Sequence, residues 1–182
     1  MIGWIVGGVI VIGGLWFVIS YNGLVTLRNR IENAWSQIDV QLKRRFDLVP
    51  NLMETVKGYA KHEKETFKMV TEARAAITKA QGFQKTAEAE NMLTGALKSL
   101  FAVSEAYPEL KANQNFLMLQ EELSGIESKI AFTRQFYNDS VLQLNTRIQT
   151  LPDSIIAGMC GFVKKDYFGV QESERQNVKV QF

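Results

Sequence analysis

Cysteine, histidine and proline are scarce in this 182-residue chain, and each scarcity excludes a class of structure. A single cysteine, Cys160, excludes an intramolecular disulfide framework. A single histidine, His62, leaves too little material for a zinc site or for the paired Glu-x-x-His motifs of a di-iron bundle. With only three prolines, long segments rich in good helix formers run without interruption. We therefore expect long helices and no metal or other cofactor.

Motifs for catalysis and nucleotide binding are also missing. The chain has no P-loop, no G-x-G-x-x-G and no G-x-S-x-G, and its net charge of +2 is too small to indicate nucleic-acid binding. Cys160 lies in an apolar context, so we expect it to pack as a small hydrophobic residue, and we expect His62 to be a solvated turn residue. We assign no catalytic residue and expect no small-molecule substrate.

Charge is absent from the first 27 residues, which precede Arg28. Residues 2–19 are all apolar or glycine and would span about 27 Å as a helix, close to the thickness of a bilayer core. The sequence predicts a membrane anchor over residues 1–20. Its lipid contacts are expected from Ile2, Trp4, Ile5, Val9, Ile12, Leu15, Trp16, Phe17 and Ile19.

Two alternatives to an anchor fit this segment less well. A cleaved signal peptide would need a basic start and an A-x-A cleavage site, and neither is present. A buried core helix that is apolar on every face is unusual in a domain of this size. Because Arg28 and Arg30 follow the span, the positive-inside rule predicts a single-pass protein of the cell membrane, with its N-terminus outside and its domain in the cytoplasm.

An apolar stripe with a spacing of about 3.6 residues runs from Leu24 to Val56 and predicts one long helix that is kinked at Pro50. We expect further helices at 63–81, 87–107 and 116–151, the last with a heptad-like rhythm typical of bundles and coiled coils. No segment alternates with period two. The predicted fold is all-α: an N-terminal transmembrane helix, an antiparallel four-helix-type bundle at 21–152 with long first and last helices, and a C-terminal segment at 153–182.

The two long helices should extend beyond the two short ones, so only two helices would form the membrane-proximal half. Two helices cannot bury their apolar stripes fully, and we expect other copies of the chain to cover them. The alternative is that residues 153–182 fold back as a cap. Candidate self-association residues are Gly3 and Gly7 of a small-x-x-x-small motif, and Leu24, Leu27, Ile31, Trp35, Phe136, Tyr137, Leu144 and Ile148.

The segment after Pro152 combines apolar and basic residues. It could lie on the membrane as an interfacial segment or cap the bundle, and both possibilities stay open. Its members are Ile155, Ile156, Met159, Phe162, Lys164, Lys165 and Phe168. The basic triplet at 43–45 lies about 35 Å beyond the span if helical, which exceeds a Debye length. We therefore expect a solvated or salt-bridged helix face there.

Three long strings of the sequence resemble the LemA proteins. They are YNGLVTLRNRIENAWSQIDVQLKRRFDLVPNLMETVKGYAKHE at 21–63, LFAVSEAYPELKANQNFLMLQEEL at 100–123 and YNDSVLQLNTRIQTLP at 137–152. The resemblance implies a bacterial membrane protein with one N-terminal span and an antiparallel helical bundle, and it carries over no catalytic residues. Proteins involved in forming magnetosome membranes are among the relatives that it implies.

The favoured hypothesis is a non-enzymatic, membrane-anchored scaffold that binds membrane lipid, associates with copies of itself and organises or remodels the membrane. The alternative is an adaptor that presents its bundle to another membrane protein, such as a protease or sensor, without forming homo-oligomers.

Overall fold

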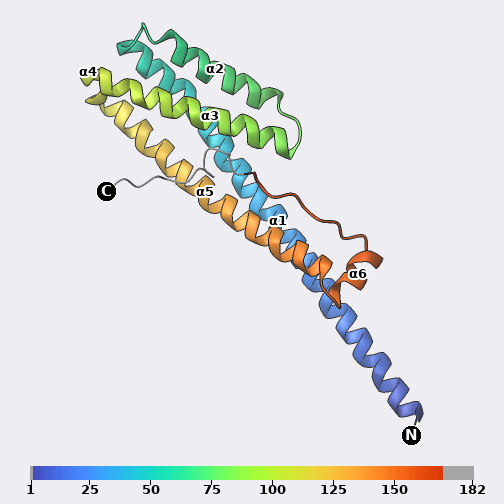
Figure 1. Cartoon of the computed structure of the whole chain (residues 1–182). Helices are drawn as coiled ribbons and strands as arrows, with labels where there is room; N and C mark the ends of the chain where they lie inside the picture. The colour runs from blue at the N-terminus through green and yellow to red at the C-terminus, as the bar shows by residue number, and fades with distance from the viewer. Residues whose placement is uncertain (1, 170–182) are drawn as a thin grey trace, which may run out of the picture. The chain divides into compact units, whose positions relative to one another are not determined.

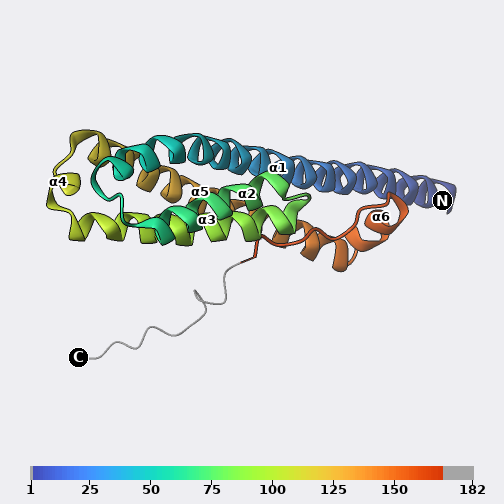
Figure 2. The same ribbon diagram turned by 90° about the horizontal axis from the view of Figure 1, so that it is seen from above.

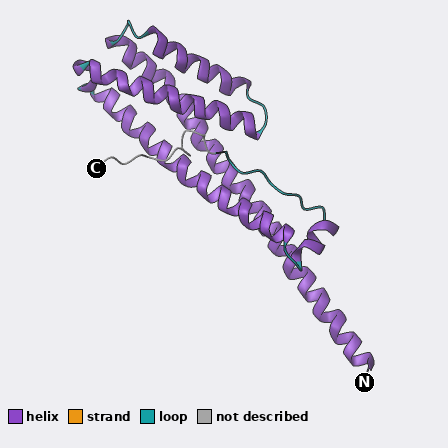
Figure 3. Cartoon of the chain, in the orientation of Figure 1, coloured by secondary structure: helices purple, strands orange, loops and turns teal. Residues whose placement is uncertain are grey.

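A computed structural model describes residues 2–169, and nearly all of them are helical (Figure 1). The elements are α1 (Ile2–Tyr59), α2 (Lys64–Lys79), α3 (Phe83–Val103), a 3-10 turn at Ser104–Ala106, α4 (Pro108–Lys111), α5 (Gln114–Gln149) and α6 (Asp153–Met159). Within these described residues no strand occurs (Figure 3). The predicted all-α fold with a long apolar N-terminal helix and two dominant helices is confirmed.

The limits of the helices follow local chemistry. α1 continues through Pro50 and ends at Tyr59, one residue after Gly58. α3 begins directly after Gly82, whose φ of +84° favours a residue without a side chain. The predicted start at 87 was therefore four residues late.

The connection between α3 and α5 holds structure that the sequence patterns did not predict. Pro108 was expected to end a helix, but it begins the four-residue α4, because proline fits the first helical turn. Asn113 then caps α5: its side-chain oxygen accepts the backbone N–H of Phe116 at 2.9 Å.

The chain divides into two compact units. Unit 2 comprises residues 39–131 together with the two described residues 168 and 169, and contains the second half of α1, α2, α3 and the first half of α5. α2 and α3 lie side by side in it (Figure 1). Its core is almost entirely aliphatic: Val49, Leu52, Met53, Val56, Ala60, Val70, Ala73, Leu93, Ala96, Leu97, Leu100, Val103, Leu110, Phe116 and Leu123. These residues recur every three or four positions, so each helix turns one apolar face inward.

Unit 1 comprises residues 2–38 and 132–167: the first half of α1, the second half of α5, α6 and the extended segment after α6. Figure 2 shows α6 beside the N-terminal part of α1. The buried residues of this unit come from all three helices: Leu24, Leu27, Ile31, Ala34, Ile38, Tyr137, Val141, Leu144, Ile156 and Ala157.

This packing corrects the reason given for self-association. Five of the candidate residues, Leu24, Leu27, Ile31, Tyr137 and Leu144, are buried within a single chain. The alternative, in which residues after Pro152 fold back, agrees with the position of α6 and the extended segment beside α1 and α5. A second copy is not needed to bury this stripe.

The expectation for Cys160 was wrong. Its side chain is exposed, because the residue caps the C-terminus of α6 and does not lie on the buried face of that helix. His62 is exposed in a turn, as predicted.

Candidate functional site

The first 18 residues of α1 form an apolar helix with little of its own chain around it. Every side chain from Ile2 to Ile19 is exposed except that of Trp16, which is half-buried, and Trp4 is 90% exposed. Among the described residues, α1 is the one helix long and apolar enough to cross a membrane. An apolar helix of this length would be strongly disfavoured in water, so the segment is a candidate membrane-spanning helix.

A polar contact marks the point where the apolar run ends. Ser20 is buried and donates its hydroxyl to the carboxylate of Asp153, the first residue of α6. Asp153 also pairs with Arg147, whose Nε lies 3.4 Å from the carboxylate. The start of α6 and the last turn of α5 are thereby tied to the end of the apolar run.

The short helix α6 has one buried and one exposed apolar side. Ile156 and Ala157 are almost fully buried, whereas Ile155 is 56% exposed and Met159 is 74% exposed. Leu151, just before α6, is also exposed. The segment therefore covers unit 1 with one side and presents large apolar side chains to its surroundings with the other.

The chain after α6 is held along α5 by side-chain-to-backbone hydrogen bonds. Asn145 donates its side-chain N–H to the carbonyl of Lys165 at 2.8 Å and accepts the N–H of Lys165 at 2.9 Å. Tyr137 donates its hydroxyl to the carbonyl of Asp166 at 3.1 Å. Burial, with a smaller contribution from the Asp166 carboxylate, raises the pKa of Tyr137 above its ordinary value.

Aromatic contacts add to this attachment. The ring of Phe162 meets Tyr21 edge-on at 6.0 Å between centroids, and the Arg28 guanidinium lies 5.9 Å from the Phe162 ring centre. Trp35 meets Tyr137 edge-on at 6.3 Å. In a segment without regular backbone pairing, the two contacts of Phe162 help to fix the path of the chain.

The predicted interfacial residues thus separate into two groups. Ile155, Met159 and Lys164 are exposed, and Phe162 and Lys165 are half-buried. Ile156 and Phe168 are buried and therefore act as packing residues. Residues 170–182 of the predicted C-terminal segment lie outside the described residues.

The remaining self-association candidates differ in exposure. An added Cβ at Gly3 or Gly7 would meet nothing within 4 Å, so this face of the span is open. Phe136 is 42% exposed, and Trp35 and Ile148 are half-buried. Phe132 is 71% exposed one turn before Phe136, and the sequence analysis missed it because it lies beside the apolar stripe. The spacing of four residues between these two phenylalanines could have indicated that they share one face of the helix.

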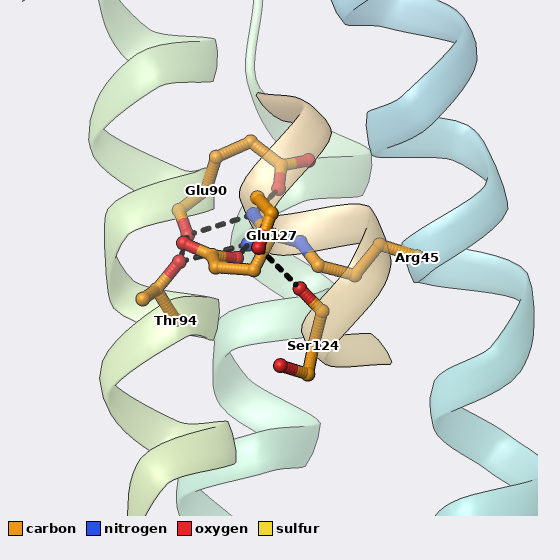
Figure 4. A network of polar contacts seen from close by, with 6 residues as sticks. Arg45, Glu90, Thr94, Ser124 and Glu127 are labelled. Atoms are coloured by element: carbon orange, nitrogen blue, oxygen red, sulfur yellow. Dashed lines mark hydrogen bonds and ion pairs between the residues drawn. The ribbon is translucent and has the colours of Figure 1, made fainter. Parts of the chain in front are cut away.

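Unit 2 contains a buried ionic cluster around Arg45 (Figure 4). The Arg45 side chain is 1% exposed and pairs with the buried carboxylate of Glu90, with Glu127 at 2.5 Å and with the Thr94 hydroxyl at 2.8 Å. The triplet at 43–45 was expected to form a solvated or salt-bridged face. Arg44 is exposed and pairs with Glu122 at 2.6 Å. Arg45 is also salt-bridged, but it is buried and does not lie on a solvated face.

No group of three or more His, Cys, Asp or Glu side chains within residues 2–169 is placed to hold a metal ion. The features that stand out are therefore the exposed apolar helix, the exposed side of α6 and the ionic cluster of unit 2.

Known proteins resemble the chain over most of its length. Magnetosome protein MamQ 2 of Paramagnetospirillum magneticum and Magnetosome protein MamQ of Magnetospirillum gryphiswaldense are each 23% identical to it over 83% of this chain. This chain covers 65% of the length of each.

A stronger similarity is to Protein LemA of Metamycoplasma hominis, which is 30% identical over 93% of this chain and 79% of that protein. The LemA family model matches residues 34–182. With the exposed apolar helix ahead of that match, these similarities show that the chain belongs to the LemA family and is a membrane-associated protein.

Proposed function

We propose that this protein is a non-enzymatic scaffold that is anchored in the membrane by residues 2–19, rests on the bilayer surface through α6, and associates with further copies of itself. The observation that carries the proposal is the contact between Ser20 and Asp153. It sets the start of α6 at the level where the apolar run of α1 ends.

The exposed side of α6 supports contact with the bilayer surface. Leu151, Ile155 and Met159 are each more than half exposed, and they gather where the anchor leaves the membrane. In water they would form an apolar patch, whereas at the interface they would enter the boundary between headgroups and acyl chains. Arg28 and Arg30 follow the anchor and favour placing unit 2, and the part of unit 1 that follows the anchor, on the cytoplasmic side.

Two open apolar surfaces support self-association in place of the buried stripe. Gly3 and Gly7 offer a face of the span on which a second helix backbone can approach closely. Phe132 and Phe136 form an exposed aromatic pair on α5. Relatives that are named as magnetosome proteins favour a role in organising or remodelling membrane.

The mass of the full chain in mild detergent tests this proposal. We expect a defined multimer for the wild type and a shift toward monomer for Gly3→Leu with Gly7→Leu, because leucine side chains separate the helix backbones. The matched control is Gly8→Leu with Gly13→Leu, whose positions lie on other faces of the helix at about 100° per residue; it should leave the multimer intact. A wild-type monomer would contradict the scaffold and favour an adaptor that presents the bundle to another membrane protein.

A further inference from the structure

A groove of about 640 Å³ opens in unit 1 between α1 and α5. Its walls combine two leucines, Leu27 and Leu142, with a set of small and polar residues. These are Gly23, Thr26, Gln143, Thr146 and Arg147. The groove is therefore amphipathic, with a cationic group and three further polar side chains beside two leucines.

Gly23 makes room for the charged group. A Cβ at this position would clash with Nη1 of Arg147, so a larger residue would push the guanidinium away from its place against α1. Asp153 holds the guanidinium at its other edge, 3.4 Å from Nε. Thr146 and Arg147 follow Gln143 by three and four residues, so they lie one turn further along α5. An amide and a hydroxyl therefore share this wall of the groove with the guanidinium.

The distance of the groove from Ser20 along α1 indicates which layer of a bilayer would surround it. Gly23 lies three residues and Thr26 six residues beyond Ser20, which is about 5 and 9 Å along the helix. The polar layer on each side of a bilayer is about 5–8 Å thick. If residues 2–19 cross the membrane, as proposed above, the end of the groove at Gly23 and Arg147 lies among the phospholipid headgroups, and the end at Thr26 lies at their outer limit.

We propose that this groove binds the phosphodiester group of a membrane phospholipid. The planar guanidinium of Arg147 donates to two phosphate oxygens, which is the geometry in which arginine recognises phosphate. The Thr146 hydroxyl and the Gln143 amide are further donors. Leu27, which is buried, and Leu142, which is 54% exposed, line the end of the groove that lies farther from the apolar run of α1. This inference rests on the proposed membrane anchor and names the lipid group that the anchored protein would hold.

Native mass spectrometry of the full chain, released from mild detergent with added phosphatidylglycerol, tests the inference. We expect the wild type to retain phospholipid at a defined stoichiometry and Arg147→Gln to lose at least tenfold in affinity. Arg30→Gln is the matched control, because it removes the same charge from an exposed position of unit 1 outside the groove. Equal losses for the two variants would indicate general charge attraction and overturn the site.

Gly23→Ala separates binding from folding. Alanine favours a helix over glycine, so α1 should remain intact, but its Cβ displaces the Arg147 guanidinium. We expect this variant to lose retained lipid as Arg147→Gln does. Lipid retention at the wild-type level in both variants would overturn the inference.

Two further measurements identify the source of the phosphate and distinguish a failure of the groove assignment from a failure of the membrane anchor. Glycerol phosphate should not displace the lipid at equal concentration; binding as tight as that of the lipid would mean a site for free phosphate and overturn the lipid assignment. All variants should stay in the membrane fraction. A wild type missing from that fraction would overturn the anchor, whereas a membrane-bound wild type without retained lipid would overturn the groove assignment alone.

Discussion

Arg45→Ala is expected to destabilise unit 2 by about 3–5 kcal/mol, because it leaves the Glu90 carboxylate buried without its ionic partner. The cost arises from an uncompensated charge and not from the loss of an attractive contact alone. Urea denaturation of the full chain in mild detergent, followed by helical circular dichroism, measures the change in the free energy of unfolding.

The neighbouring residue provides the control. Arg44→Ala removes an exposed ion pair with Glu122 and is expected to cost about 0–1 kcal/mol. Replacing both buried partners, as Arg45→Met with Glu90→Leu, should recover most of the lost stability, because neither charge is then left alone. Equal stability of the Arg45→Ala and Arg44→Ala variants would show that the cluster is not buried as described.

Val9→Arg combined with Ile12→Arg is expected to release the protein from the membrane. An arginine near the middle of a span costs about 2.5–3.5 kcal/mol, so the pair costs about 5–7 kcal/mol and removes most of the inserted population. Separation of membrane and soluble fractions, followed by alkaline extraction of the membranes, measures the outcome.

Val40→Arg is the matched control for this pair. Val40 lies on the same helix, is 61% exposed and belongs to unit 2, so a charge there should leave fractionation unchanged. If the double variant stays in the membrane fraction as the control does, residues 2–19 are not the anchor.

The long helices could be predicted because their signals are local. The apolar stripe from Leu24 to Val56 and the one in α5 specify which face is buried wherever the partner helix lies. The apolar start of α1 was equally readable, because the absence of charge before Arg28 does not depend on tertiary contacts.

The burial of Arg45 could not be predicted from its neighbours in the sequence. A basic triplet predicts a solvated helix face unless a partner carboxylate is known. The partners of Arg45, Glu90 and Glu127, are 45 and 82 residues away in the sequence. The position of Glu90, three residues before the buried Leu93, was the one available hint that a carboxylate lies on an inward face.

The position of the C-terminal segment was left open for a similar reason. Its path depends on Ser20 with Asp153 and on Asn145 with Lys165, which are contacts across 133 and 20 residues. A segment without regular periodicity carries no local signal of such attachment. The sequence therefore left two covers for the apolar stripe open, further copies of the chain or the segment after Pro152.

The depth of Cys160 in a bilayer most directly tests the claim that α6 lies at the membrane surface. It is the single cysteine of the chain and is exposed at the end of α6, so a polarity-sensitive fluorophore can be attached there selectively. With the full chain in phospholipid vesicles, we expect blue-shifted emission and quenching by lipids brominated near the headgroup. A label on Ser128→Cys in a Cys160→Ser background, at an exposed site of unit 2, should show neither. An unshifted, unquenched label at Cys160 would contradict a position of α6 at the membrane surface.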